Sequence, residues 1–297
     1  MGMATLSQLI ARHAGVKQRA VVPAYRAVAR ANVFLPGPRV FANSFPKGGT
    51  HLLSALLGEL PRMMFSGVHR AAGDFTAGAP RADAANMDWD GLRRTLRGVR
   101  NGQFMTAHFP YVEGMERELD DLGYRSLLIL RDPRDVVVSA QHYVAKMESH
   151  DLHRRFTEQF RTADERIRAT IEGFPADELG RGQDSIGERL GRYLPWLSMP
   201  EVLVVRFEDL IGQAGGGSRQ RQDELVEAIA RHVGRPLSPE RVRAVAGRVW
   251  SDKSSTFRQG RAGGWRDELT PDHIALFKAV AGDQLVALGY EADLDWA

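Results

Sequence analysis

Residues 44–53, which decide the fold class, read Ser44-Phe45-Pro46-Lys47-Gly48-Gly49-Thr50-His51-Leu52-Leu53. A strand candidate at residues 40–45 leads into the two glycines, and a helical pattern over residues 50–60 follows them. Backbone N–H groups at a helix N-terminus attract anions, and glycine lets an anion approach the backbone closely. The stretch therefore predicts a phosphate-binding loop between a strand and a helix.

Two side chains strengthen the phosphate-loop interpretation. Lys47 supplies a positive charge beside the glycines, and Thr50 supplies a hydroxyl donor. The loop is not a Walker A loop, because that motif, G-x-x-x-x-G-K-[ST], places its lysine after the glycines and Lys47 precedes them. A purely structural turn is the alternative for this segment taken alone.

Outward from this loop, short apolar runs alternate with longer helical patterns. Strands are predicted at residues 40–45, 103–107, 126–130 and 202–207. Helices are predicted near residues 50–60, 90–100, 133–148, 153–172, 185–197, 221–234, 238–249 and 271–288. This alternation predicts an α/β fold of phosphate-loop type, in which one domain has a central parallel sheet flanked by helices. The irregular segment 73–86 is predicted to be a substrate-side loop, and 212–217 a surface loop.

Composition excludes several classes of protein. The 297 residues are 43% hydrophobic and 26% charged, which excludes a disordered chain. No apolar run reaches about 18 residues, so no transmembrane helix is expected. The absence of cysteine excludes disulfides, cysteine-ligated metals and a thiol nucleophile.

The basic residues are unevenly distributed. The net charge is +3, yet the first acidic residue is Glu59. Seven basic residues precede it: Arg12, Lys17, Arg19, Arg26, Arg30, Arg39 and Lys47. This distribution predicts an anionic partner. It also predicts a basic N-terminal arm at residues 1–36, which either docks on its own domain or makes weak membrane-surface contact through residues 1–30, followed by a domain at 37–297.

A second segment places charged residues at the carboxyl end of a buried strand. Arg131 follows the predicted strand 126–130, Asp132 is a suitable helix N-cap, and Pro133 suits the first helical position. Arg131 is thus expected at the carboxyl edge of the sheet, where α/β folds bind ligands. Ser139, two helical turns further on, could present its hydroxyl to the same pocket. The alternative is a capped helix with a surface Arg–Asp pair.

Two more segments carry chemistry. Arg258-Gln259-Gly260-Arg261-Ala262-Gly263-Gly264-Trp265-Arg266 is a cationic, glycine-rich loop suited to a phosphate, or to solvent or nucleic acid. Thr106-Ala107-His108-Phe109-Pro110 ends the second strand. Histidine has an ordinary pKa of about 6.5, so His108 suits proton abstraction near neutral pH. A buried histidine bonded to backbone is the alternative.

Together these four segments resemble the sulfotransferases that use 3′-phosphoadenosine 5′-phosphosulfate (PAPS), particularly the cytosolic type and its bacterial relatives. The motifs occur in the family's order over about residues 40–270. The resemblance implies transfer of a sulfuryl group from PAPS to a hydroxyl of a small-molecule, glycoside or carrier-linked acceptor. It also implies a cytoplasmic location, no metal requirement and no nucleic-acid partner.

The resemblance implies roles for individual residues. His108 would be the general base, Lys47 would stabilise the leaving phosphate, and Ser139 would engage that lysine. The 5′-phosphosulfate would contact Lys47, Gly48, Gly49, Thr50 and His51. The 3′-phosphate would contact Arg131, Ser139, Arg258 and Gly260, and Phe207 would lie near the adenine. Leu52 and Gln259 complete the positions expected to bind PAPS.

Some positions depart from the family pattern. Gly48 stands for a serine, Leu52 for an adenine-stacking tryptophan, Gln259 for a lysine and Gly264 for an aspartate. Trp250 is a candidate to stack on adenine instead. The family's C-terminal dimer segment is not recognisable, so the sequence leaves the oligomeric state open.

The acceptor site and two other functions stay open at this point. Apolar candidates for acceptor contacts are Phe65, Phe75, Met87, Trp89, Tyr111 and Met147. One alternative function is that of a phosphate-loop kinase or nucleotide hydrolase. The other is a non-enzymatic module that binds anions or a membrane surface through the basic arm.

Overall fold

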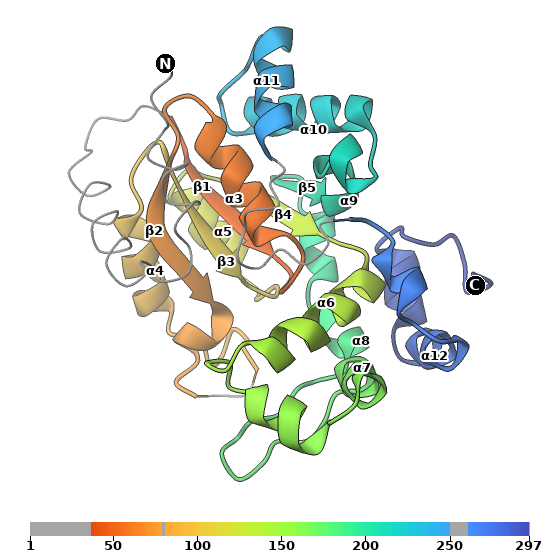
Figure 1. Cartoon of the computed structure of the whole chain (residues 1–297). Helices are drawn as coiled ribbons and strands as arrows, with labels where there is room; N and C mark the ends of the chain where they lie inside the picture. The colour runs from red at the N-terminus through yellow and green to blue at the C-terminus, as the bar shows by residue number, and fades with distance from the viewer. Residues whose placement is uncertain (1–36, 79–80, 250–260, 297) are drawn as a thin grey trace. The chain divides into compact units, whose positions relative to one another are not determined.

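The computed structural model of the chain describes residues 37–78, 81–249 and 261–296 (Figure 1). These residues belong to two compact units. Among the described residues, the sheet unit comprises 37–78, 81–130, 199–249 and 261, and the helical unit comprises 131–198 and 262–296.

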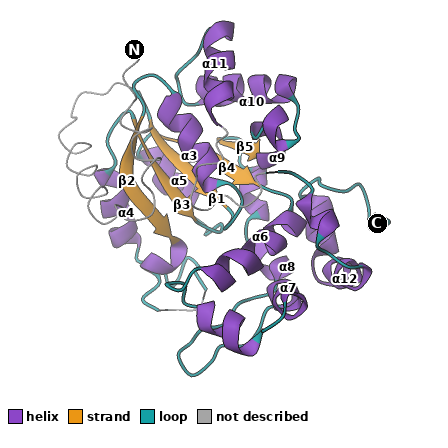
Figure 2. Ribbon diagram, in the orientation of Figure 1, coloured by secondary structure: helices purple, strands orange, loops and turns teal. Residues whose placement is uncertain are grey.

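The sheet unit contains a five-stranded, all-parallel sheet (Figure 2). Its strands are β1 (Arg39–Ser44), β2 (Met64–Ala71), β3 (Gln103–His108), β4 (Tyr124–Leu130) and β5 (Val202–Arg206). Their order across the sheet is β2-β3-β1-β4-β5. The central strand β1 is buried from Val40 onward, as expected for a strand covered on both faces, and its residues 40–42 are apolar. The four predicted strands and the α/β fold class are confirmed.

The fifth strand, β2, was not predicted. Its sequence, MFSGVHRA, mixes apolar and polar residues around Gly67, because β2 lies at the sheet edge and is only partly buried. The register with β3 also shifts between Phe65 and His69, so no regular alternation marks the strand.

The helices of the sheet unit either connect strands from β1 to β4 or follow β5 in the chain. They are α3 (Thr50–Glu59), α4 (Trp89–Gly98), α5 (Met115–Asp121), α9 (Phe207–Leu210), α10 (Arg219–His232) and α11 (Pro239–Val249). The chain moves from β1 through α3 to β2 on one side, and from β3 through α5 to β4 in the opposite direction. With right-handed crossovers, α3 and α5 cover opposite faces of the sheet. In open parallel sheets, ligands bind outside the carboxyl ends of the strands where the connections change direction, which here occurs at β1.

The helical unit consists of α6 (Pro133–Lys146), α7 (Ala163–Glu172), α8 (Ile186–Gly191) and α12 (Pro271–Ala287) with short turns between them. α12 packs on α7 and α8, and α7 packs on α6. The helix predicted at 153–172 is instead a π-helical turn, Arg155–Gln159, followed by α7, because Thr162 caps a new helix. The helix predicted at 185–197 ends at Gly191 and continues as a 3₁₀ turn, Leu194–Ser198.

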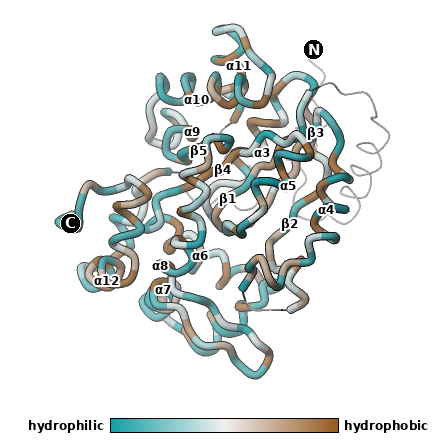
Figure 3. The backbone as a smooth tube through the Cα atoms, turned by 180° about the vertical axis from the view of Figure 1, so that it is seen from behind, coloured by the Kyte–Doolittle hydropathy of each residue, from teal (hydrophilic) through white to brown (hydrophobic). Residues whose placement is uncertain are grey.

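Hydrophobic segments run through the interior of both units. In Figure 3 the apolar run of β4 is among the hydrophobic stretches, in agreement with the burial of Ser126–Leu130. The irregular segment predicted at 73–86 begins in a 3₁₀ turn, Ala72–Phe75, and ends at Asp88, which caps α4. Two of the predicted acceptor contacts in this region, Phe75 and Met87, are buried in the core.

Candidate active site

The predicted phosphate loop connects β1 to α3. Gly49 is the N-cap of α3 with a φ of 113°, and no side chain caps this helix end. The first turn of α3 contains no acidic residue. The N-terminal N–H groups of a ten-residue helix therefore point at a position where an anion can serve as the cap.

Packing requires both glycines of this loop. A Cβ atom on Gly49 would lie 2.8 Å from Cδ2 of Phe207 and 2.9 Å from Cδ1 of Ile129. A Cβ atom on Gly48 would lie 2.7 Å from the carbonyl oxygen of Phe45. Lys47 adopts a φ of 66°, a left-handed conformation that costs energy outside glycine and is concentrated at functional sites. Residues 47–49 therefore form a tight backbone turn that carries the side chain of Lys47.

Phe207 lies against this turn. It is the first residue of α9, directly after β5, and is 8% exposed. Its ring is close to Gly49, so the structure brings the predicted adenine neighbour to the predicted phosphate loop. Two further residues that were predicted to bind PAPS, His51 and Leu52, lie in the first turn of α3.

His108 ends β3 and is partly buried. Its Nδ1 lies 3.0 Å from the carbonyl oxygen of Ser44, and 3.1 Å from the Ser44 hydroxyl. Because a carbonyl only accepts, Nδ1 carries the ring proton, and the lone pair of the neutral ring is on Nε2. Burial lowers the pKa of His108 to about 4, against the hydrogen bond to Ser44, and His69, His51 and Lys47 lower it further.

Ser44 and Asn43 hold this histidine relative to the loop. The Ser44 hydroxyl lies 2.5 Å from the Thr50 hydroxyl, which links His108 to the first turn of α3. Asn43 donates to the carbonyl of Phe109 at 2.8 Å and accepts from its N–H at 2.9 Å. Neither Asn43 nor Ser44 was among the predicted site residues. Their signal in the sequence is a pair of polar residues at the end of an apolar strand, and both are 2% exposed or less.

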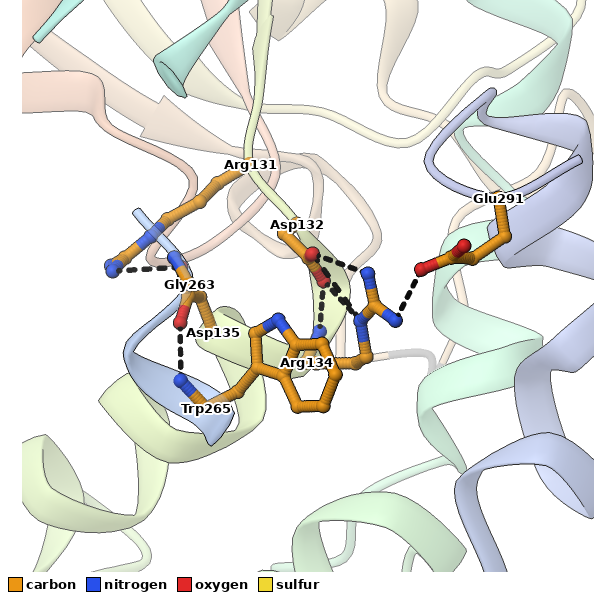
Figure 4. Close-up of polar contacts among 7 residues, drawn as sticks. All are labelled: Arg131, Asp132, Arg134, Asp135, Gly263, Trp265 and Glu291. Carbon is orange, nitrogen blue, oxygen red and sulfur yellow. Dashed lines mark hydrogen bonds and ion pairs between the residues drawn. The ribbon is translucent and has the colours of Figure 1, made fainter. Parts of the chain in front are cut away.

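In the helical unit, the start of α6 holds a second charged cluster (Figure 4). Arg131 directly follows β4, and its guanidinium lies 3.6 Å from the carboxylate of Asp135. That carboxylate also accepts the N–H groups of Gly263 and Trp265, both at 2.9 Å. Asp135 is 2% exposed, and burial raises its pKa. It therefore joins Arg131 to the end of the predicted cationic loop.

Arg134 and Asp132 form a buried ion pair at the start of α6. The alternative of a surface Arg–Asp pair is therefore wrong. Arg134 donates to Asp132 and, from Nη1 at 2.6 Å, to Glu291. Its guanidinium carbon lies 4.0 Å from the centre of the Trp265 ring and 4.6 Å from that of Trp296. Asp132 is the N-cap of α6, as predicted, and Pro133 is its first residue.

The structure places the predicted residues as follows. The phosphate loop, His108 and Phe207 come together in the sheet unit, while Arg131 and the partly buried Ser139 belong to the helical unit. Four predicted or candidate residues lie outside the described residues: Trp250, Arg258, Gln259 and Gly260. Within the described residues no group of three or more His, Cys, Asp or Glu side chains is arranged to hold a metal ion. No helix in the described part of the chain is long and apolar enough to cross a membrane.

Comparison with known proteins defines the class. The sequence profile of the Sulfotransferase domain matches residues 37–289, so the chain belongs to the sulfotransferase family, and the predicted family is confirmed. This match spans both units as one domain. Among curated protein sequences none matches the chain significantly.

Solved structures show the same fold. The crystal structure of mouse sulfotransferase SULT7A1 complexed with PAP has 15% sequence identity and a TM-score of 0.54, and the match covers 89% of this chain and 96% of that one. Retinol dehydratase in complex with androsterone and inactive cofactor PAP has 16% identity and a TM-score of 0.52, with 89% of this chain and 85% of that one covered. The phosphate-loop fold type is therefore shared with these proteins.

Proposed function

We propose that this chain transfers a sulfuryl group from PAPS to a hydroxyl of a small-molecule, glycoside or carrier-linked acceptor, without a metal. The observation that carries the proposal is the uncapped N-terminus of α3, joined through Ser44 to a histidine that is neutral at physiological pH. Membership of the sulfotransferase family supports the reaction class.

The residues of the phosphate loop fit the 5′ end of this donor. PAPS, when bound, supplies the sulfuryl group and leaves as the bisphosphate PAP, adenosine 3′,5′-bisphosphate. The tight turn that requires Gly48 and Gly49 leaves the N–H groups of Thr50, His51 and Leu52 at the start of α3, and these N–H groups would hold the 5′-phosphate. The Lys47 ammonium beside it would stabilise the negative charge that develops on the leaving phosphate.

Arg131, Ser139 and the 258–260 segment are proposed to bind the 3′-phosphate. The Arg131 guanidinium carries a permanent charge, and Asp135 fixes its direction. Ser139 would also engage Lys47. Phe207, against Gly49, would border the adenine. Recognition of a 3′-phosphate is the property that separates this donor from ATP.

His108 is proposed to be the general base. Its Nε2 carries the lone pair because Nδ1–H donates to the Ser44 carbonyl, so Nε2 can accept the proton of the acceptor hydroxyl. With a pKa of about 4, the ring is neutral at pH 7 and is available as a base without prior deprotonation. General-base catalysis contributes about 100- to 10,000-fold.

The remaining parts of the proposal concern the acceptor and the arm. The retinol dehydratase structure contains androsterone, which favours apolar hydroxyl compounds among the possible acceptors. Residues 37–297 would form the catalytic domain, and residues 1–36 a basic arm that contacts either this domain or, weakly, a membrane surface. We propose a cytoplasmic location and no nucleic-acid partner.

Calorimetry without metal tests the donor. PAP is expected to bind at least about tenfold more tightly than ATP, since two phosphate sites are used. Tighter binding of ATP, or binding of ATP that requires Mg²⁺, would instead favour a kinase or nucleotide hydrolase.

Transfer of labelled sulfuryl groups from PAPS to a panel of phenols and alcohols tests the chemistry. His108→Ala is expected to bind PAP normally and to lose at least about 100-fold in transfer. His232→Gln is the control, because that histidine lies on α10 and contacts the Ser126 carbonyl instead. If polyanions bind without any transfer, and deletion of residues 1–36 abolishes that binding, the non-enzymatic alternative is correct.

A further inference from the structure

A second histidine lies beside His108. The register pairs Phe65 with Phe104 but His69 with Thr106, so β2 contains two more residues than β3 between these points. Gly67, with a φ of 75°, lies within this irregularity. Such irregularities redirect side chains and occur often next to active sites. Here the result is that His69 stands opposite Thr106, two residues before the predicted base.

His69 is fixed on this side of the sheet by two contacts. Its Nδ1 lies 2.9 Å from the hydroxyl of Thr106. Its ring centre lies 4.9 Å from that of His108, with an angle of 81° between the ring planes. His69 is exposed, whereas His108 is partly buried. One histidine therefore packs edge-to-face on the other, and the outer ring lies on the solvent side.

We propose that His69 is a positioning residue for the base: it holds the orientation of the His108 ring and limits water access to it. This inference rests on the proposed function, in which His108 accepts the proton of the acceptor hydroxyl. His108 is anchored at Nδ1 by Ser44, and the perpendicular His69 ring blocks rotation about that anchor. Nε2 is then presented in one direction, which positioned proton transfer requires.

The charges around His69 and His108 determine whether removal of His69 raises or lowers the pKa of His108. The charged and titratable groups that face the two rings are Lys47, His51, Arg70 and Asp74. Of these only Asp74 is acidic. When His69 is protonated, its charge opposes a second positive charge on His108, and when it is neutral its ring still reduces hydration of His108. Both effects keep His108 unprotonated, so removal of His69 must raise the pKa of His108.

Histidine NMR of the full-length protein measures this pKa without an acceptor. Without PAP, we expect His108 to titrate at about 4 in the wild type. His69→Phe keeps a ring on His108 but removes the charge, and is expected to raise that value by about 0.5 pH unit, as Coulomb's law gives for this separation in water. His69→Ala also admits water and is expected to give a larger rise. Thr106→Val, which only releases His69 from its hydrogen bond, is expected to give a smaller one.

The same NMR titration of His108 provides the control and the result that would overturn the proposal. His232→Gln, far from the pair along the chain, is expected to leave the titration of His108 unchanged. If His108 titrates within about 0.2 pH unit of wild type in both His69 variants, the positioning role is refuted. A stability loss without that shift also refutes it, because a merely structural residue would do the same.

Different results would refute the proposed function. If PAP does not bind, or if His108→Ala retains full transfer, the proposed function is wrong whatever the His69 variants show. If PAP binds and His108 is essential while its titration ignores His69, the inference alone is wrong.

Discussion

Asp135→Asn tests whether the buried carboxylate organises the helical unit. The wild-type carboxylate accepts the N–H groups of Gly263 and Trp265 with its two oxygens and faces Arg131. Asparagine offers only one oxygen, so one N–H would face an NH₂ group instead. The substitution is nearly isosteric, and it changes hydrogen bonding and charge without changing packing.

The expected loss in the free energy of unfolding follows from the contacts of Asp135 with Gly263, Trp265 and Arg131. Losing one hydrogen bond to a charged group costs about 1.5–3 kcal/mol, and a buried unsatisfied donor costs about 1–3 kcal/mol. Relief of the buried charge, whose pKa is already raised, offsets part of this. A net loss of about 3 kcal/mol lowers Tm by about 5 °C for a chain of 297 residues, given an unfolding entropy of about 2.1 cal/mol/K per residue.

Calorimetry and hydrogen exchange together measure this effect. Asp90→Asn is the matched control: Asp90 also lies in the first turn of its helix, but its side chain is 78% exposed. Its Tm is expected to change by less than about 1 °C. In Asp135→Asn the amide of Trp265 should also lose protection. Equal melting temperatures for the two variants, with Trp265 still protected, would refute the assigned role.

Three further changes test other parts of the fold and site. Gly49→Ala is expected to lower PAP affinity at least about tenfold in calorimetry, because its Cβ would meet Phe207 and its φ is 113°. Gly98→Ala, whose Cβ meets nothing within 4 Å, should bind PAP normally. Equal PAP affinities of the two variants would contradict a binding role for the turn at Gly49. Arg134→Lys is expected to destabilise the protein by about 2–4 kcal/mol in urea, since lysine cannot replace the forked contacts of a buried guanidinium; a loss below about 1 kcal/mol would show that those contacts matter little. The pKa of His108 is lowered to about 4, so the unfolded state binds the proton more readily between about pH 6.5 and 4, and stability falls as the pH falls through that window. His108→Gln should flatten this dependence in melting curves at pH 7.5 and 5, and identical slopes would mean that the histidine is not desolvated.

The sequence predicted the parts of the molecule that depend on local pattern. β1, the glycine loop and α3 follow each other within about 20 residues, so periodicity and the glycines were sufficient. Asp132 and Pro133 predicted the start of α6 for the same reason. Edge strand β2 was missed, because partial burial and a register shift leave no periodic signal.

Contacts between distant residues could not be predicted in this way. Asp135 reaches Trp265, 130 positions away, and Arg134 reaches Glu291, 157 positions away. Nothing local distinguishes either carboxylate from a solvent-exposed one. Asn43 gave a weak signal as a polar residue in an apolar strand, but only the fold shows that it pairs with Phe109 beside the base.

The uncapped first turn of α3 couples the stability of the folded state to any anion that binds there. Most helix ends are completed by a side chain of the same protein, but the N-terminus of α3 has no side-chain cap. An anion that binds only the folded chain raises its stability in proportion to the logarithm of its concentration. If PAPS is the donor, as proposed, PAPS and its product PAP carry the same 5′-phosphate and would compete for this helix end. The stability of the folded protein and its inhibition by PAP would then be linked through the N-terminus of α3.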